Sequence, residues 1–142
     1  MIVLLVFYIS NAVADNPELI VVQTTLASFT GDLLYEKSPI VITDRIVNVD
    51  ELIASSFKYM YASAKHVDVT IDKQEKNKYK YMVLHSSLKG GAVLLTHPLT
   101  SESTQIIMHP HTVLVIPKSF GFVVQGAVPE KVMGLHTVLS VF

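Results

Sequence analysis

Two histidines separated by one residue, His109 and His111, are the side chains of this sequence whose type and spacing best suit metal chemistry. Successive side chains of a β-strand point to opposite faces, so a His-x-His pair within a strand would project both imidazoles to one side. Imidazole nitrogens bind iron, zinc and nickel. Pro110 lies between the two, however, and proline marks strand ends and edges because it cannot donate to the strand ladder. The pattern therefore favours turn-end histidines over a continuous ligand strand.

A metal site at this pair would need a third ligand, together with partners that orient the rings. The nearest acidic residue downstream is Glu130, so the fold would have to bring His97 or His136 to the pair. We expect no bound metal. A metal-dependent enzyme of the cupin type is the alternative, and its candidate ligands are His109, His111 and His136.

Other catalytic chemistry finds little support in the sequence. Cysteine is absent, which excludes disulfides, thiolate nucleophiles and cysteine zinc sites. There is no Gly-x-Ser-x-Gly elbow, and the segment Leu88–Gly91 lacks the spacing of a phosphate loop and is typical of a hairpin turn. The acidic residues lie mainly outside the apolar segments in which a carboxyl pKa could be shifted. We therefore predict a non-enzymatic protein with no catalytic residues and no cofactor.

The composition indicates a partly covered surface. The 142 residues predict one domain, residues 1–142. Half of them are hydrophobic and only 16% are charged, compared with about 25% in typical soluble domains. The net charge is −1 and the pI is about 6.6, which provides no basic face for nucleic acid. We expect a protein partner and no nucleic-acid binding.

One helix is well marked. Asn48 is a good N-cap, and Glu51 follows three residues later as in a capping box. Apolar and aromatic residues then recur at helical spacing. These features predict a helix from Val49 to Ala64, with its aromatic side chains packed in the core.

Most of the remaining chain consists of short apolar or β-branched runs separated by turn signals. They predict strands at 19–26, 39–43, 92–96, 105–109, 112–117, 121–125 and 132–142. Many short strands at regular spacing are typical of sandwiches and barrels. With the single helix they predict a mainly β, α+β protein, namely a compact β-barrel or a jelly roll of the cupin-like double-stranded β-helix type.

The most polar segment, residues 65–85, is predicted to form a charged hairpin. Val67, Val69 and Ile71 alternate with polar residues, which favours an exposed strand. Residues 74–77 would form the tip and residues 79–85 the return strand. The predicted partner contacts in this segment are Lys73, Lys76, Lys78, Lys80 and Tyr79.

The first fourteen residues, MIVLLVFYISNAVA, combine an apolar run with a small-x-small pattern that resembles a signal-peptide cleavage site. No Lys or Arg precedes the run, and it is shorter than the roughly 20 apolar residues that span a bilayer. We favour an apolar N-terminal strand. The alternatives are an uncleaved signal-like segment or a membrane contact through residues 1–14, in a secreted or membrane-surface binding protein.

Two segments resemble parts of a known family. Residues 38–46, SPIVITDRI, followed by the predicted helix, resemble the entry of cupin-like domains related to the JmjC hydroxylases. Residues 113–124, VLVIPKSFGFVV, resemble their late strand and turn, where Pro117 and Phe120 match a proline and an aromatic residue. Phe122 stands about where that family has its last iron-binding histidine, and the earlier His-x-Asp or His-x-Glu pair is not found. The resemblance implies a double-stranded β-helix that has lost its metal ligands.

The sequence as a whole also resembles small cupin-like or jelly-roll proteins of large icosahedral DNA viruses. It is apolar, free of cysteine and poor in arginine, with Lys and Tyr in its polar segment. In such viruses small β proteins serve as minor capsid components. The resemblance implies a structural role in capsid assembly, with the major capsid protein and other minor capsid proteins as partners. The implied location is the capsid shell of the virion, and secretion is the alternative.

Overall fold

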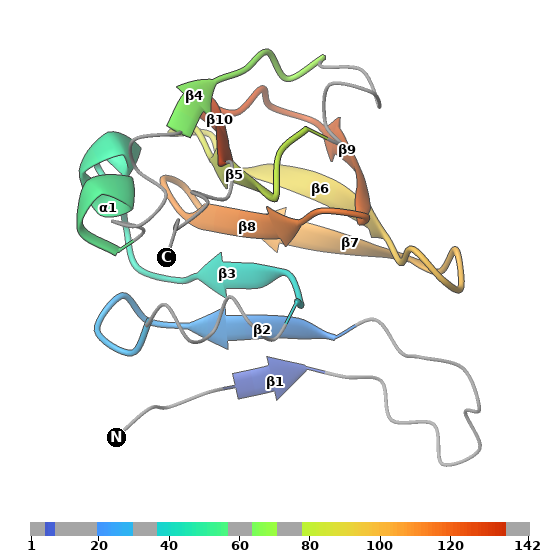
Figure 1. The fold of residues 1–142 in the computed structure, drawn as a ribbon. Helices are drawn as coiled ribbons and strands as arrows, with labels where there is room; N and C mark the ends of the chain where they lie inside the picture. Colours follow the sequence, from blue (N-terminus) through green and yellow to red (C-terminus); the bar gives the residue numbers. More distant parts are fainter. Residues whose placement is uncertain (1–4, 8–19, 30–36, 57–63, 71–77, 136–142) are drawn as a thin grey trace, which may run out of the picture.

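The computed structural model describes residues 5–7, 20–29, 37–56, 64–70 and 78–135, which form a mainly β structure with one short helix (Figure 1). This confirms the predicted class. The elements are β1 (Leu5–Phe7), β2 (Val21–Thr24), β3 (Ile40–Ile42), α1 (Val49–Ser56), β4 (Ala64–His66), β5 (Tyr81–His85), β6 (Gly91–Thr96), β7 (Ser103–Met108), β8 (Val113–Pro117), β9 (Gly121–Gln125) and β10 (Lys131–Leu135).

The larger sheet contains seven strands in the order β1-β2-β3-β8-β5-β10-β4. Its neighbouring strands are antiparallel, apart from the parallel pair β2 and β3. Every residue of the two central strands β5 and β8 is buried. Both faces of these strands are covered, which explains why their sequences are continuous apolar runs rather than alternating ones.

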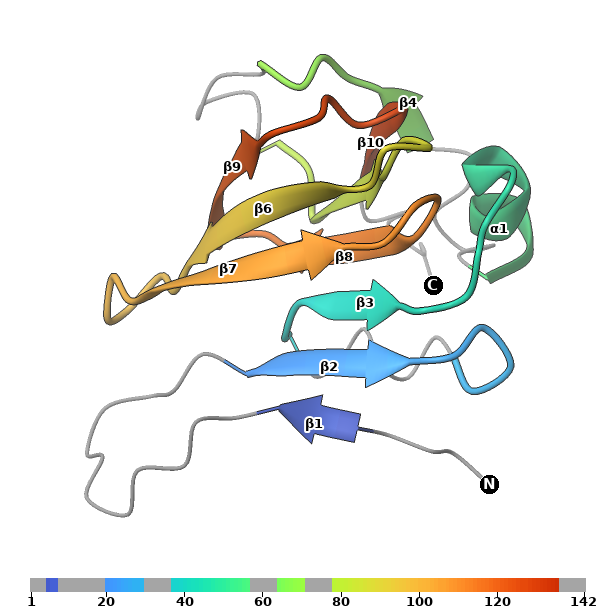
Figure 2. The ribbon, with the colours of Figure 1, turned by 180° about the vertical axis from the view of Figure 1, so that it is seen from behind.

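The smaller sheet has three antiparallel strands in the order β7-β6-β9 and packs against one face of the larger sheet. Figure 2 shows β6 and β7 in front of β8. The core between the sheets includes Val93, Leu95, Met108 and Phe122 from the smaller sheet and Met82, Leu84, Leu114 and Ile116 from the larger. The strands thus divide into two sheets, and the described residues form no closed barrel. Of the two predicted architectures, a compact β-barrel or a jelly roll, the barrel is therefore wrong for the described residues.

Helix α1 and the loop before it cover the other face of the larger sheet. Leu52 and Ile53 of the helix share a core cluster with Val83 of β5 and Val113 of β8. Alternate residues of β5 and β8 therefore face the helix and the smaller sheet, as the strand period requires. The resulting order of layers is helix, larger sheet, smaller sheet.

The helix begins as predicted and ends earlier. The backbone N–H of Glu51 donates to Oδ1 of Asn48 at 3.2 Å, which confirms the N-cap. The helix ends at Ser56 and residues 57–63 lie outside the described residues. Ala64 belongs to strand β4, where it pairs with Leu135 of β10. The predicted helix end at Ala64 is therefore wrong, because strand pairing overrides the helical spacing there.

The predicted charged hairpin is also corrected. Strand β10 lies between β4 and β5, so the two ends of residues 65–85 are not paired with each other. After β4, Asp68 Oδ1 accepts a hydrogen bond from the backbone N–H of Thr70 at 2.9 Å, and this turn replaces the predicted exposed strand. The same bond lowers the pKa of the Asp68 carboxyl. Residues 71–77, with the predicted tip, lie outside the described residues.

The remaining strand predictions are confirmed within a few residues, from β2 and β3 to β10, whose described part ends at Leu135. Residues 136–142 lie outside the described residues. At the other end, β1 confirms a strand within residues 1–14 and pairs with β2 at the edge of the larger sheet (Figure 1). No helix in the described part of the chain has the length and apolar content needed to cross a membrane.

Candidate functional site

Side chains that can bind a metal gather at the end of strand β5. This strand is antiparallel to both of its neighbours, so its last residue, His85, lies where β8 and β10 begin. In register, His85 pairs with Val113 on one side and with Lys131 on the other. His111 and Glu130 lie immediately before these two strands, and the pairing therefore brings them next to His85.

The ring of His85 is buried and held in one orientation. The residue is 1% exposed, and its Nε2 lies 2.5 Å from the carbonyl oxygen of Ile46. A carbonyl oxygen only accepts hydrogen bonds, so Nε2 carries the proton and the lone pair of the neutral ring is on Nδ1. Ile46 is held in turn, because its backbone N–H donates to the carbonyl oxygen of His111 at 2.7 Å. The loop after β3 is thereby attached to the site.

His111 occupies the third position of a tight turn that begins at His109. The backbone N–H of Thr112 donates to the carbonyl oxygen of His109 at 3.4 Å, and His111 has a φ of 54°. Proline in the second position and a positive φ in the third are typical of a type II turn. For a residue other than glycine the left-handed conformation costs about 1–2 kcal/mol. The two histidines thus lie in a turn, as the proline indicated, and not in a ligand strand.

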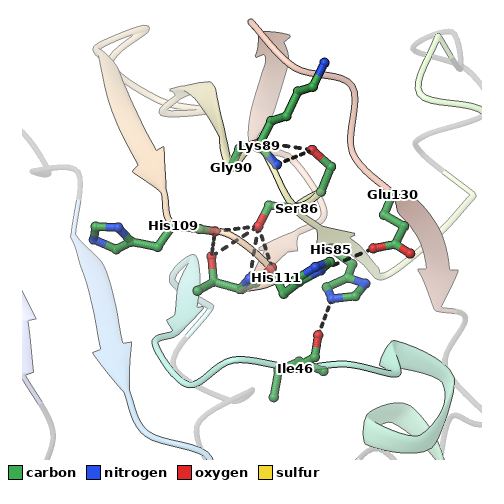
Figure 3. A network of polar contacts seen from close by, with 10 residues as sticks. Ile46, His85, Ser86, Lys89, Gly90, His109, His111 and Glu130 are labelled. Atoms are coloured by element: carbon green, nitrogen blue, oxygen red, sulfur yellow. Dashed lines mark hydrogen bonds and ion pairs between the residues drawn. The ribbon is translucent and has the colours of Figure 1, made fainter.

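Ser86 fastens this turn to the end of β5. Its hydroxyl donates to the carbonyl oxygen of His109 at 2.6 Å and accepts a hydrogen bond from the backbone N–H of Thr112 at 3.0 Å. The hydroxyl of Thr112 donates to the same carbonyl at 2.8 Å. Ser86 and Thr112 are both buried, so the position of the turn relative to the sheet is fixed by a desolvated network (Figure 3).

Glu130 completes a group of three possible metal ligands with His85 and His111. Its backbone N–H donates to the carbonyl oxygen of His85 at 2.9 Å, and its Oε2 lies 3.3 Å from Nδ1 of His111. The ring centroids of the two histidines are 5.6 Å apart. Each of the three residues offers one ligand atom, and these atoms lie within 4.8 Å of one another. The Nδ1 of His111 is buried without a hydrogen-bond partner in the described structure, so its contact with Glu130 has an ion-pair distance but not hydrogen-bond geometry.

One of the three sequence candidates belongs to this group. His111 does, whereas His109 is exposed and its ring points away from His85 and Glu130 (Figure 3). Only the carbonyl oxygen of His109 takes part in the network. His136 lies outside the described residues. Sequence analysis missed His85 and Glu130, because their proximity depends on the pairing of β5 with β8 and β10.

His97, the other histidine considered as a distant ligand, has a local role. Its Nδ1 accepts hydrogen bonds from the backbone N–H groups of Leu99 and Thr100, at 3.1 and 3.3 Å. The ring also contacts Phe120 edge to face, with centroids 5.7 Å apart. His97 therefore caps the turn between β6 and β7, and its Nδ1 is engaged there.

The outer face of the smaller sheet is a second candidate site, formed by side chains that point away from the larger sheet. The register of the three strands assigns nine residues to it: Ala92, Leu94, Thr96, Ser103, Gln105, Ile107, Gly121, Val123 and Gln125. None of the nine is charged. Ile107 is 64% exposed and Val123 60%. Gln105 Nε2 donates to Gln125 Oε1 at 2.9 Å across β6, so these amides are paired with each other.

The predicted partner contacts around β5 divide into surface and core. Lys78 and Lys80 are exposed, whereas Lys73 and Lys76 lie outside the described residues. Tyr79 is buried, in the core between the two sheets. Its ring lies over Gly134 of β10, where an added Cβ would be 2.6 Å from Tyr79 Cγ. Tyr79 therefore packs inside the protein and does not present a contact surface.

Comparison with protein-family models, with curated proteins and with solved structures finds no match to this chain.

Proposed function

We propose that this chain is a non-enzymatic assembly protein whose outer sheet face packs against neighbouring protein chains. The observation that carries this proposal is the absence of charge from the nine residues of that face, together with the exposure of Ile107 and Val123. Charged residues are depleted at the centres of protein interfaces. The reason is that removing a charged group from water costs more free energy than removing an apolar or amide group. A sheet face in contact with water would instead be expected to carry charged side chains.

The open strand edges support the same role. Within the described residues, β7 is an edge of the smaller sheet, and β1 and β4 are the edges of the larger. Unpaired strand edges present rows of N–H and C=O groups that pair readily with another chain. The exposed Lys78 and Lys80 lie just before β5 and are proposed as peripheral contacts that set orientation rather than affinity.

We further propose that the fold is a jelly roll of the cupin-like kind. An eight-stranded jelly roll places its strands in two facing sheets, in the orders 1-8-3-6 and 2-7-4-5. With β4 as strand 1 and β5 to β10 as strands 3 to 8, the orders β4-β10-β5-β8 and β9-β6-β7 agree with this arrangement. No described strand corresponds to strand 2, and residues 71–77, between β4 and β5, lie outside the described residues. In this arrangement β1, β2 and β3 extend the larger sheet.

Within assembly proteins, we propose a minor capsid component of a large icosahedral DNA virus, located in the virion. Jelly rolls recur in viral capsid proteins and in cupins, although a fold does not by itself determine a function. The partners would be the major capsid protein and other minor capsid proteins. The resemblance of the sequence supports this narrower proposal, and the uncharged sheet face supports the proposed mode of contact.

The experiment measures incorporation of a tagged chain into purified virus particles by quantitative mass spectrometry. The test variant carries Ile107→Lys and Val123→Lys on the outer face. Val47→Lys is the matched control, because Val47 is 79% exposed and lies in the loop before α1, away from that face. We expect the double variant to lose incorporation at least about tenfold, as two charges buried at an interface would require, while the control is incorporated normally.

Thermal unfolding of the purified variants separates loss of contact from loss of folding. The Tm of the double variant should lie within a few degrees of that of the unmodified chain, because substitutions of exposed residues change the free energy of unfolding by only about 0.5 kcal/mol. Normal incorporation of a folded double variant would contradict the proposed face. Recovery of the unmodified chain only as a soluble monomer, never with particles, would contradict the assembly role itself.

A further inference from the structure

We propose that His85, His111 and Glu130 bind one divalent transition-metal ion, with zinc as the best match, and that this ion joins the ends of strands β5, β8 and β10. Two imidazoles and one carboxylate are a donor set that zinc accepts, with a solvent molecule completing four-coordination. The site is distinct from the outer sheet face and independent of the proposed assembly role. It also differs from the sequence-based alternative, since His109 takes no part.

The donor atoms are the first support. Zinc bonds to nitrogen and oxygen are about 2.0–2.2 Å long, so two ligands of one tetrahedral ion lie roughly 3.3 Å apart. The Nδ1 of His111 and the Oε2 of Glu130 are 3.3 Å apart. A neutral imidazole donating to the carboxylate would form a hydrogen bond at that distance, yet this buried Nδ1 forms none. The two atoms have the spacing of neighbours on a common ion.

The orientation of His85 is the second support. A histidine that binds a metal through one ring nitrogen commonly donates its other N–H to a backbone carbonyl. The Nε2 of His85 does this with Ile46, which leaves Nδ1 as the lone-pair nitrogen. His85 is almost completely buried, so its side chain loses little conformational entropy when an ion binds. One possible ligand atom from each of the three residues lies within 4.8 Å of the other two.

The backbone around His111 is the third support. A non-glycine residue at a φ of 54° stores conformational strain, and such strain persists only where the surroundings hold it. Here Ser86 and Thr112 hold the turn, and the turn holds the imidazole against Glu130 (Figure 3). The site also has access for an ion, because the side chain of Glu130 is 49% exposed and that of His111 is 16% exposed. The carboxylate neutralises one of the two charges of the ion.

The test is calorimetric titration of zinc chloride into the full-length chain after treatment with a chelator, with cobalt(II) absorption as a second, geometry-sensitive probe. The variants are His111→Gln and Glu130→Gln, and His109→Gln is the matched control two residues away in the same turn. We expect one ion per chain, a cobalt spectrum typical of tetrahedral coordination, and a Tm that rises with added zinc. Each of the two test variants should weaken zinc binding at least about tenfold, and the control should leave it unchanged.

Circular dichroism and Tm without metal establish that each variant is folded. Glu130 is half-exposed, so Glu130→Gln keeps the test valid even if His111→Gln does not fold. Failure of the unmodified chain to bind zinc or cobalt at unit stoichiometry would overturn the proposal. An equal loss of affinity in His109→Gln would do so too, because it would indicate surface histidine binding rather than this site.

Discussion

The Nδ1 of His111 lies 3.3 Å from the Oε2 of Glu130, yet it forms no hydrogen bond with it. The turn that places this nitrogen is held from the sheet side by Ser86 and requires a positive φ at His111. The backbone conformation and the side-chain position of His111 thus favour different residue types. The backbone conformation would suit glycine, whereas the position of the ring suits an interaction with Glu130.

Substitutions of His111 can separate the energetic effect of its backbone conformation from that of its ring. Without metal, the free energy of unfolding of His111→Gly should lie within about 1 kcal/mol of that of the unmodified chain. Glycine adopts a positive φ without steric cost, but it is more flexible in the unfolded state, and these two effects oppose each other. His111→Val should be less stable than His111→Gly by about 2 kcal/mol or more, because a β-branched residue is an outlier at this φ. Urea unfolding in the presence of a chelator measures both. Equal stability of the Gly and Val variants would contradict the assigned turn.

The close packing of Tyr79 on Gly134 predicts that a larger residue at position 134 lowers the stability of the protein. An added Cβ at Gly134 would lie 2.6 Å from Tyr79 Cγ, so Gly134→Ala forces the ring or strand β10 to move. We expect a loss of about 1–3 kcal/mol in the free energy of unfolding, the usual range for overpacking. Gly91→Ala is the control, because the nearest atom to its added Cβ is the carbonyl oxygen of Ala127 at an ordinary 3.5 Å.

A second substitution tests the cause. Combining Gly134→Ala with Tyr79→Ala should remove the clash, so the two effects should be strongly non-additive, as expected for residues in contact. Additive effects in urea unfolding would mean that the ring does not limit the space at Gly134.

Local sequence patterns were sufficient for most elements and insufficient for their pairing. The N-cap at Asn48 and the strand that became β8 were predictable, because capping chemistry and continuous apolar runs depend on neighbouring residues. The end of the helix and the partner of β4 were not, since Ala64 pairs with Leu135, far along the chain. Helical spacing carries no information about such a distant partner.

The candidate metal site shows the same limit. Pro110 correctly indicated that His109 and His111 flank a break, but the direction of each ring follows from the turn type and its anchor on Ser86. His85 and Glu130 are separated from His111 by 26 and 19 residues, and only the antiparallel pairing of β5 with β8 and β10 joins them. A sequence search for closely spaced ligands could not find this group.

The hydroxyl of Ser86 should matter for stability because it is buried and bonded to the turn on two sides. Ser86→Ala removes the acceptor for the backbone N–H of Thr112 and the donor for the carbonyl oxygen of His109. We expect a loss of about 1–3 kcal/mol, because two buried hydrogen bonds are lost and each contributes about 0.5–1.5 kcal/mol. The carbonyl oxygen of His109 keeps its hydrogen bond from the hydroxyl of Thr112. Ser103→Ala is the control, because its hydroxyl bond to Thr96 is exposed. Equal Tm values for the two variants would show that the turn is not anchored through Ser86.

The N-terminal segment yields the prediction that separates a strand from a signal. Strand β1 pairs with β2 through Leu5, Val6 and Phe7, and β2 carries the buried Val21 and Val22. Intact mass of the chain from its natural source should therefore include residues 1–14. A chain that begins at Asp15 would instead support the secreted alternative.

Recombinant chain lacking residues 1–14 should show a lower Tm and concentration-dependent association, because β2 would then be an unpaired edge. A truncated chain as stable and as monomeric as the full one would mean that β1 contributes nothing to the sheet.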